Sequence, residues 1–164
     1  LFRSTAAAAS SDSAVGWTVN DYPGTELCAA RRYVKGKTAW ELRMSPDGAV
    51  SIVLPAKNPK GFGPDDRFAV AFFKGADQSD RIARYFAEGF VGENSVGYLL
   101  MTYTTAQADK SNTDRFLRDF SQTGRITISF EGEQFLSITI PRSRQAVVGQ
   151  MSACLSAVAE GRDF

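Results

Sequence analysis

Apolar and polar residues alternate along most of the chain in short stretches, and this pattern predicts β-strands separated by turns. In the first third of the chain the predicted strands span residues 16–19, 26–34, 37–45 and 49–54. Lys35 and Gly36 suit a two-residue hairpin turn, and the Ser-Pro-Asp-Gly stretch at 45–48 suits a type I turn. We therefore expect these strands to form an antiparallel meander.

The middle of the chain combines one loop with three further strands. Three prolines and two glycines within residues 55–66 exclude regular structure there. Residues 67–74 are almost all apolar, as in a central strand, and residues 98–103 also follow a strand pattern. Residues 81–91 alternate but contain alanines that a helix would tolerate, and we favour a strand for them.

A first helix is predicted after residue 110. Ser111 to Asp114 matches the Ser-x-x-Asp signature of a helix start. Phe116, Leu117 and Phe120 then fall on one apolar stripe, and Gly124 stops the helix.

A hairpin and a second helix complete the chain. Residues 125–130 and 134–140 are predicted strands, joined by a turn at 131–133. Ser143 can cap a final helix that runs to about Glu160. Its apolar stripe includes Cys154 and must pack on the sheet.

These elements predict an α+β fold. In it, a mostly antiparallel, curled sheet of about seven to nine strands carries two helices, with the C-terminal helix packed on the sheet. The length of 164 residues suits one domain. We place this globular domain at residues 15–164 and expect residues 1–14, which lack periodicity, to be a disordered Ala/Ser leader.

The leader bears on the compartment. Four alanines at residues 6–9 provide the Ala-x-Ala arrangement of a signal-peptidase site. This arrangement predicts a periplasmic or secreted protein from which an N-terminal signal or anchor has been removed; a flexible tail without targeting meaning is the alternative. No stretch approaches the roughly 18 apolar residues of a membrane span, so we expect no transmembrane segment.

The two cysteines lie near opposite ends of the domain. Cys28 is in a strand pattern near the start of the fold, and Cys154 is on the apolar stripe of the last helix. A disulfide between them is our expectation, and two buried free thiols are the alternative. The pair has neither the spacing of a redox motif nor enough ligands for a metal site.

Composition excludes several kinds of catalysis. The chain has no histidine, so it contains no Ser-His-Asp or Cys-His machinery and no imidazole metal ligand. Nineteen Lys and Arg against 18 Asp and Glu leave a net charge of +1, which gives no support for a nucleic-acid-binding protein. We expect no cofactor and no metal.

Three sequence patterns resemble functional sites, but each has a simpler structural interpretation. The Gly-Lys-Thr stretch at 36–38 resembles the end of a phosphate-binding loop, but Arg31 stands where the first glycine belongs, which favours a turn. Asp65 and Asp66 are not part of a calcium-loop spacing and suit solvated loop acids. A single-strand nucleic-acid groove could be formed by the basic residues and aromatics at 31–40 together with Lys57, Lys60 and Phe62, but the low net charge favours the charged outer face of a meander.

The loop at residues 57–67 is the best remaining candidate for binding, because contact residues often lie on loops held by a rigid scaffold. The candidate partner-binding residues are Lys60, Phe62, Asp65, Asp66 and Arg67. Phe62 lies between two glycines and is either an exposed aromatic anchor or a ring that folds back onto the core.

One resemblance to a known family extends over most of residues 16–158. It rests on the sequences at 16–19, 28–30, 113–117, 124–128 and 151–154. In these stretches the chain resembles small exported bacterial proteins of the invasion-associated locus B type. The resemblance implies an exported, disulfide-bearing, non-enzymatic domain connected with the cell envelope or with host contact.

The function expected from the sequence is therefore a non-enzymatic, exported binding or accessory domain with a protein partner. An inhibitor or immunity-type protein, which blocks an enzyme through the 57–67 loop, is the alternative. A histidine-free hydrolase would need two carboxylates converging in one cleft, roughly 5–10 Å apart for glycoside chemistry.

Overall fold

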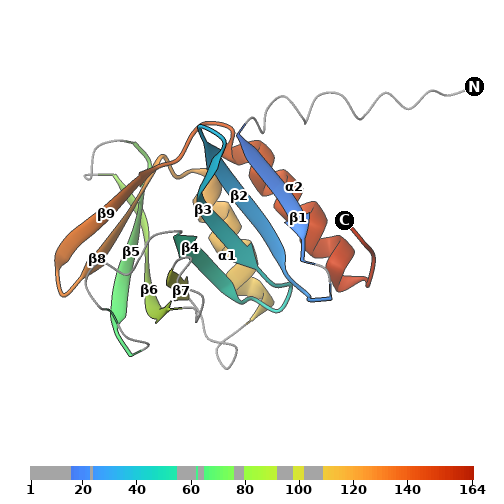
Figure 1. The fold of residues 1–164 in the computed structure, drawn as a ribbon, viewed down its shortest axis with the longest axis horizontal. Coiled ribbons are helices and arrows are strands. Elements are labelled where there is room, and N and C mark those ends of the chain that lie inside the picture. Colours follow the sequence, from blue (N-terminus) through green and yellow to red (C-terminus); the bar gives the residue numbers. More distant parts are fainter. Residues whose placement is uncertain are drawn as a thin grey trace, which may run out of the picture.

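The computed structural model of the protein describes residues 16–22, 24–54, 62, 65–75, 80–91, 98–101 and 109–164. Figure 1 shows its strands and helices. In chain order these are β1 (Trp17–Asp21), β2 (Cys28–Val34), β3 (Lys37–Met44), β4 (Val50–Leu54), β5 (Arg67–Phe73), β6 (Arg81–Val91), β7 (Tyr98–Met101), α1 (Lys110–Ser121), β8 (Arg125–Phe130), β9 (Glu133–Thr139) and α2 (Arg144–Ala159). The predicted strand at 81–91 and both predicted helices are confirmed.

The strands are hydrogen-bonded in the order β1-β2-β3-β4-β7-β6-β5-β8-β9. Every neighbouring pair is antiparallel, so the α+β prediction is confirmed. β1 and β9 are the two edges and lie at opposite sides of the molecule in Figure 1, so the sheet is open. The predicted curl of the sheet is not confirmed.

The two helices cover one face of this sheet. In Figure 1 both lie behind β1 to β4. Alternate side chains of β3, β4 and β5 are buried on this helix-covered face, for example Leu42 and Met44 in β3 and Val70 and Phe72 in β5. Phe116 of α1 meets the ring of Phe72 at a centroid distance of 5.2 Å.

The core contacts join segments that are distant in sequence. Phe120 of α1 lies 6.2 Å from the ring of Trp40 in β3 and 6.5 Å from that of Trp17 in β1, both in edge-to-face geometry. Such pairs add about 0.5–1.5 kcal/mol beyond the burial of apolar area. The two tryptophans are therefore core residues, as their alternation with polar residues indicates.

The helix starts differ in detail from the prediction. α1 is capped by Asp109, whose side chain accepts a hydrogen bond from the backbone N–H of Ser111 at 3.0 Å. The predicted start at Ser111 is therefore two residues late. Ser143 does precede α2, but its hydroxyl accepts from the indole N–H of Trp17 at 3.1 Å and makes no capping hydrogen bond.

Cys28 of β2 and Cys154 of α2 form a disulfide across the core, which confirms the predicted pairing. Both side chains are fully buried, and their Cα atoms are 6.1 Å apart. The bond ties the front of the chain to its last helix over 126 residues. Among the described helices, none is both long and apolar enough to span a membrane.

Candidate functional site

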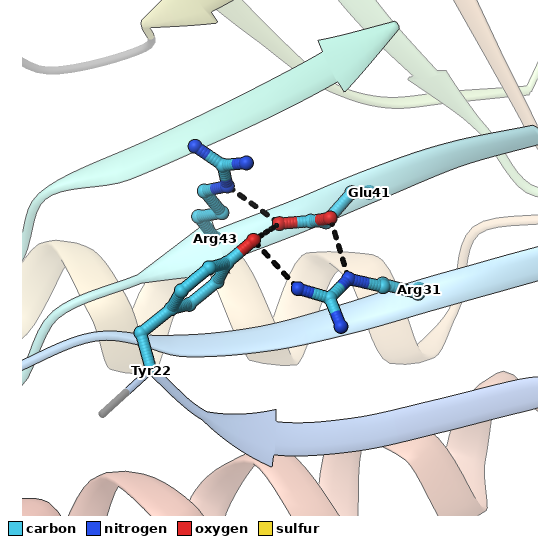
Figure 2. A network of polar contacts seen from close by, with 4 residues as sticks. All are labelled: Tyr22, Arg31, Glu41 and Arg43. Carbon is cyan, nitrogen blue, oxygen red and sulfur yellow. Dashed lines mark hydrogen bonds and ion pairs between the residues drawn. The ribbon is translucent and has the colours of Figure 1, made fainter. Parts of the chain in front are cut away.

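The sheet face opposite the helices, here called the open face, carries a cluster of four polar side chains. Tyr22, Arg31, Glu41 and Arg43 converge there in front of the strands, while the helices lie behind (Figure 2). Arg31 of β2 is directly opposite Glu41 of β3 in the sheet register, and Arg43 is two residues further along β3 on the same face. Tyr22 follows β1 and extends across both strands.

The Glu41 carboxylate is the centre of this cluster. Its Oε1 accepts from the Tyr22 hydroxyl and from Arg43 Nε, both at 2.5 Å, and its Oε2 accepts from Arg31 Nε at 2.8 Å. Arg31 Nη2 also donates to the Tyr22 oxygen at 2.8 Å. The Tyr22 ring lies between the two guanidinium groups, 5.1 Å from Arg31 and 5.0 Å from Arg43.

The cluster keeps Glu41 charged although its side chain is only 8% exposed. Burial alone would raise the pKa of this carboxyl, but the hydrogen bonds from Tyr22, Arg43 and Arg31 outweigh it and hold the pKa below its ordinary value. The hydrogen bond to Glu41 likewise raises the pKa of Arg31. Glu41 is thus ionised at neutral pH and is poorly suited to general acid catalysis.

The Arg43 guanidinium has both of its Nη groups as spare donors. The cluster has two positive charges and one negative charge. The Nη atoms of Arg43 point away from Glu41 in Figure 2 and donate to no other described residue. The arrangement can therefore hold an arginine rigidly on the open face, where it can meet an anionic group.

A shallow groove of about 530 Å³ lies on the same open face, over β5, β6 and β8. Its floor consists of small side chains, because Ala71 is opposite Thr127 and Ala69 is opposite Ser129 in the β5–β8 register. We call this feature the arginine groove, because two exposed arginines of β6 line it, Arg81 and Arg84.

Arg81 and Arg84 have no carboxylate partner among the described residues of the groove. Neither guanidinium makes a hydrogen bond or an ion pair with another described residue, and none of the groove-lining residues is Asp or Glu. Arg84 is opposite Ala71 and lies over the ring of Phe86 at 5.0 Å. The groove is therefore an electropositive site with an aromatic ring beside it.

The predicted binding residues of the 57–67 loop differ in exposure where the structure describes them. Lys60 lies outside the described residues. Asp65 and Arg67 are exposed and Asp66 is half-buried. Arg67 begins β5 opposite Glu88 of β6.

The alternative of Phe62 as an exposed anchor is wrong, because the ring is only 8% exposed. It packs against three rings, at centroid distances of 4.9 Å from Phe68, 4.9 Å from Phe130 and 5.3 Å from Phe135. The burial of a large aromatic surface explains why the ring turns inward instead of remaining in solvent.

The basic stretch at 31–40 contributes to intramolecular contacts. Arg31 belongs to the Glu41 cluster, and Arg32 donates to the backbone oxygen of Gly16 at 3.1 Å and lies over the Trp17 ring. These contacts fit the charged face of a meander.

Neither open-face feature is evident from the sequence alone. The strands that contribute them were predicted, but the contacts depend on register between strands. In the described residues, no group of three or more His, Cys, Asp or Glu could hold a metal ion.

Comparisons with models of known protein families, with curated proteins and with solved structures gave no match to this chain.

Proposed function

We propose that the protein is a non-enzymatic, exported binding domain that recognises another protein through the open face of its sheet. The observation that carries this proposal is the arginine groove, where Arg81 and Arg84 are exposed without a carboxylate partner among the described residues. Arginine is enriched in the residues that dominate binding energy at protein interfaces.

The disulfide supports the exported part of the proposal. Disulfides persist mainly in the periplasm and in secreted proteins, whereas the reducing cytosol keeps most thiols free. A buried bond between Cys28 and Cys154 is therefore typical of a periplasmic or secreted domain. The resemblance to proteins of the invasion-associated locus B type implies the same compartment.

The state of Glu41 supports a binding role over catalysis. Three donors satisfy the one buried carboxylate of the open-face cluster. A general acid at neutral pH needs a raised pKa, and this carboxyl has a lowered one. The cluster is better suited to holding Arg31 and Arg43 in fixed positions than to transferring a proton.

The inhibitor alternative has less structural support. It relied on an exposed Phe62 in the 57–67 loop, and that ring is buried. Asp65 and Arg67 remain as exposed charges that could contact an enzyme. The two functions are separated by the surface they need: the open face for the first, and the loop for the second.

A capture experiment tests the proposal. The tagged protein, the Arg81→Glu/Arg84→Glu variant and the control variant Arg118→Glu are each incubated with envelope extract and culture medium from the source organism. Arg118 is an exposed arginine of α1, on the helix side of the sheet. We expect one protein to be retained by the parent chain and by Arg118→Glu and to be lost with the double variant.

Two results would contradict the proposal. One is a partner that the double variant retains as well as the parent chain does. The other is the repeated absence of any retained protein. A partner lost instead with Asp65→Ala/Arg67→Ala would favour the inhibitor function.

A further inference from the structure

The arginine groove has a specific shape that follows from the sheet register. Side chains opposite each other on neighbouring strands are about 4.5–5.5 Å apart at Cβ and form rows across the sheet. One row on the open face is Arg84–Ala71–Thr127–Ser137, and the next is Phe86–Ala69–Ser129–Gln134. Each row has a large side chain on β6 and small ones on β5 and β8, so β6 forms a wall above a low floor.

The charged side chains within these rows are all positive. A third row adds Arg81 and Arg125 on either side of Phe73, so the three rows contain three arginines and no carboxylate. The next carboxylate along β6 is Glu88, which lies opposite Arg67 in a fourth row. The whole chain has a net charge of only +1, so this local excess of positive charge is not a general property of the surface.

Phe86 adds an apolar component at the same wall. Its side chain is 64% exposed, the highest value among the exposed large hydrophobic residues of the described chain. The Arg84 guanidinium over the ring fixes a cation and an aromatic surface together. A ligand that fits this wall combines negative charge with an apolar group.

We propose that the arginine groove binds an acidic segment of a partner protein, with carboxylates of that segment against Arg81 and Arg84 and one of its apolar side chains on Phe86. This inference rests on the proposed function and specifies its partner. The planar guanidinium fork of arginine matches a carboxylate with two parallel hydrogen bonds. Free phosphate has no apolar group for Phe86, and nucleic-acid modules are usually far more basic overall.

The test uses defined peptides and fluorescence anisotropy. The probe is a labelled peptide that combines glutamates with one phenylalanine, and the control peptide has glutamine at each glutamate position. We expect the parent protein to bind the acidic peptide and not the glutamine peptide, with affinity falling as salt rises. Inorganic phosphate at equal concentration should compete weakly, because it engages only the arginines.

Variants assign the binding to the groove. Arg81→Glu/Arg84→Glu should weaken binding at least about tenfold, because the introduced glutamates carry the same negative charge as the acidic peptide and repel it. Phe86→Ala should weaken it several-fold, and Arg118→Glu should leave it unchanged. Circular dichroism and a count of free thiols verify that each variant is folded with its disulfide closed.

The inference is overturned if the acidic and glutamine peptides bind equally, if neither binds, or if the double variant binds as the parent does. Full competition by phosphate would also overturn it, since the apolar contact would then contribute nothing. If the capture experiment still yields a partner that depends on Arg81 and Arg84, only the acidic-segment inference has failed. If no such partner is found, the proposed function has failed as well.

Discussion

At the scale of single residues, the Glu41 cluster shows how a charge can be buried beneath an exposed face. The carboxylate is 8% exposed, whereas the side chains of Arg31 and Arg43 are 31% and 34% exposed. The two arginines and the Tyr22 hydroxyl thus replace water around Glu41 with three donated hydrogen bonds. Loss of the carboxylate would remove the one acceptor to which side chains from β2, β3 and the segment after β1 all donate.

Glu41→Gln tests this role. A neutral amide cannot accept three strong hydrogen bonds, and the two arginines of the cluster then lose their counter-charge. We expect a loss of about 1–3 kcal/mol in the free energy of unfolding, measured by urea denaturation. Glu26→Gln, at an exposed glutamate before β2, is the matched control and should change stability little. Equal stability of the two variants would show that the cluster is not stabilising.

The same residue predicts a pH dependence. The pKa of Glu41 is lower in the folded protein than the ordinary value of 4.5 for an unfolded chain. The unfolded state therefore takes up a proton first as the pH falls, and the stabilising contribution, complete above pH 4.5, is lost through the folded-state pKa. We expect Glu41→Gln to lose less stability than the parent between pH 5 and pH 3, by thermal melting. A parallel decline would contradict this assignment.

At the scale of elements, the turn between β3 and β4 supports the start of α1. The Thr113 hydroxyl of α1 donates to the backbone oxygen of Ser45 at 3.1 Å. Gly48 in this turn has a φ of 103°, and a Cβ atom built on it would lie 1.9 Å from the backbone oxygen of Asp109, the N-cap of α1. The turn and the helix start therefore meet backbone to backbone, which only glycine permits.

Gly48→Ala should accordingly lower the free energy of unfolding by more than Gly36→Ala does. Gly36 also has a positive φ, of 75°, but an added Cβ there meets nothing within 4 Å. The Gly36 variant thus measures backbone strain alone, of order 1 kcal/mol, and the excess loss at Gly48 measures the clash with α1. Chemical denaturation of both variants gives the comparison, and equal losses would show that the contact with Asp109 relaxes without cost.

At the scale of the whole molecule, the two faces of the sheet differ: one holds buried side chains and the disulfide, and the other presents charged side chains. The helix-covered face contains the Cys28–Cys154 bond and buried apolar side chains such as Leu42, Val70 and Phe72. The open face presents Arg81 and Arg84, which have no carboxylate partner among the described residues. This arrangement agrees with the proposed function, in which the helix-covered face stabilises the fold and the open face binds a partner.

Reduction of the disulfide should destabilise the whole domain. In the chain-entropy model, a bond that closes a loop of this length stabilises by up to about 5 kcal/mol. We expect the urea midpoint of the parent protein to fall under a strong reductant, while Cys28→Ala/Cys154→Ala should be unstable with or without it. Mass spectrometry after alkylation verifies the thiol count. An unchanged midpoint in protein shown to be fully reduced would contradict a stabilising role.

The sequence by itself determined the elements of this protein. Alternation of apolar residues predicted the strands, including the one at 81–91, because burial of one face imposes a period of two on the local sequence. The apolar stripe of the last helix also placed Cys154 on the buried side, which made the disulfide predictable.

Only the tertiary structure decided which strands pair and which side chains become neighbours. A two-residue turn at 35–36 would place Arg31 opposite Trp40, but a register shift between Arg32 and Tyr33 places it opposite Glu41 instead. The arginine groove similarly requires β5 to pair with both β6 and β8. Register and strand order are set by packing between distant segments. The alternation of apolar and polar residues within one strand does not depend on which strand it pairs with, so it cannot predict them. Phe62 is buried for the same reason, since the three rings that cover it come from β5, β8 and β9.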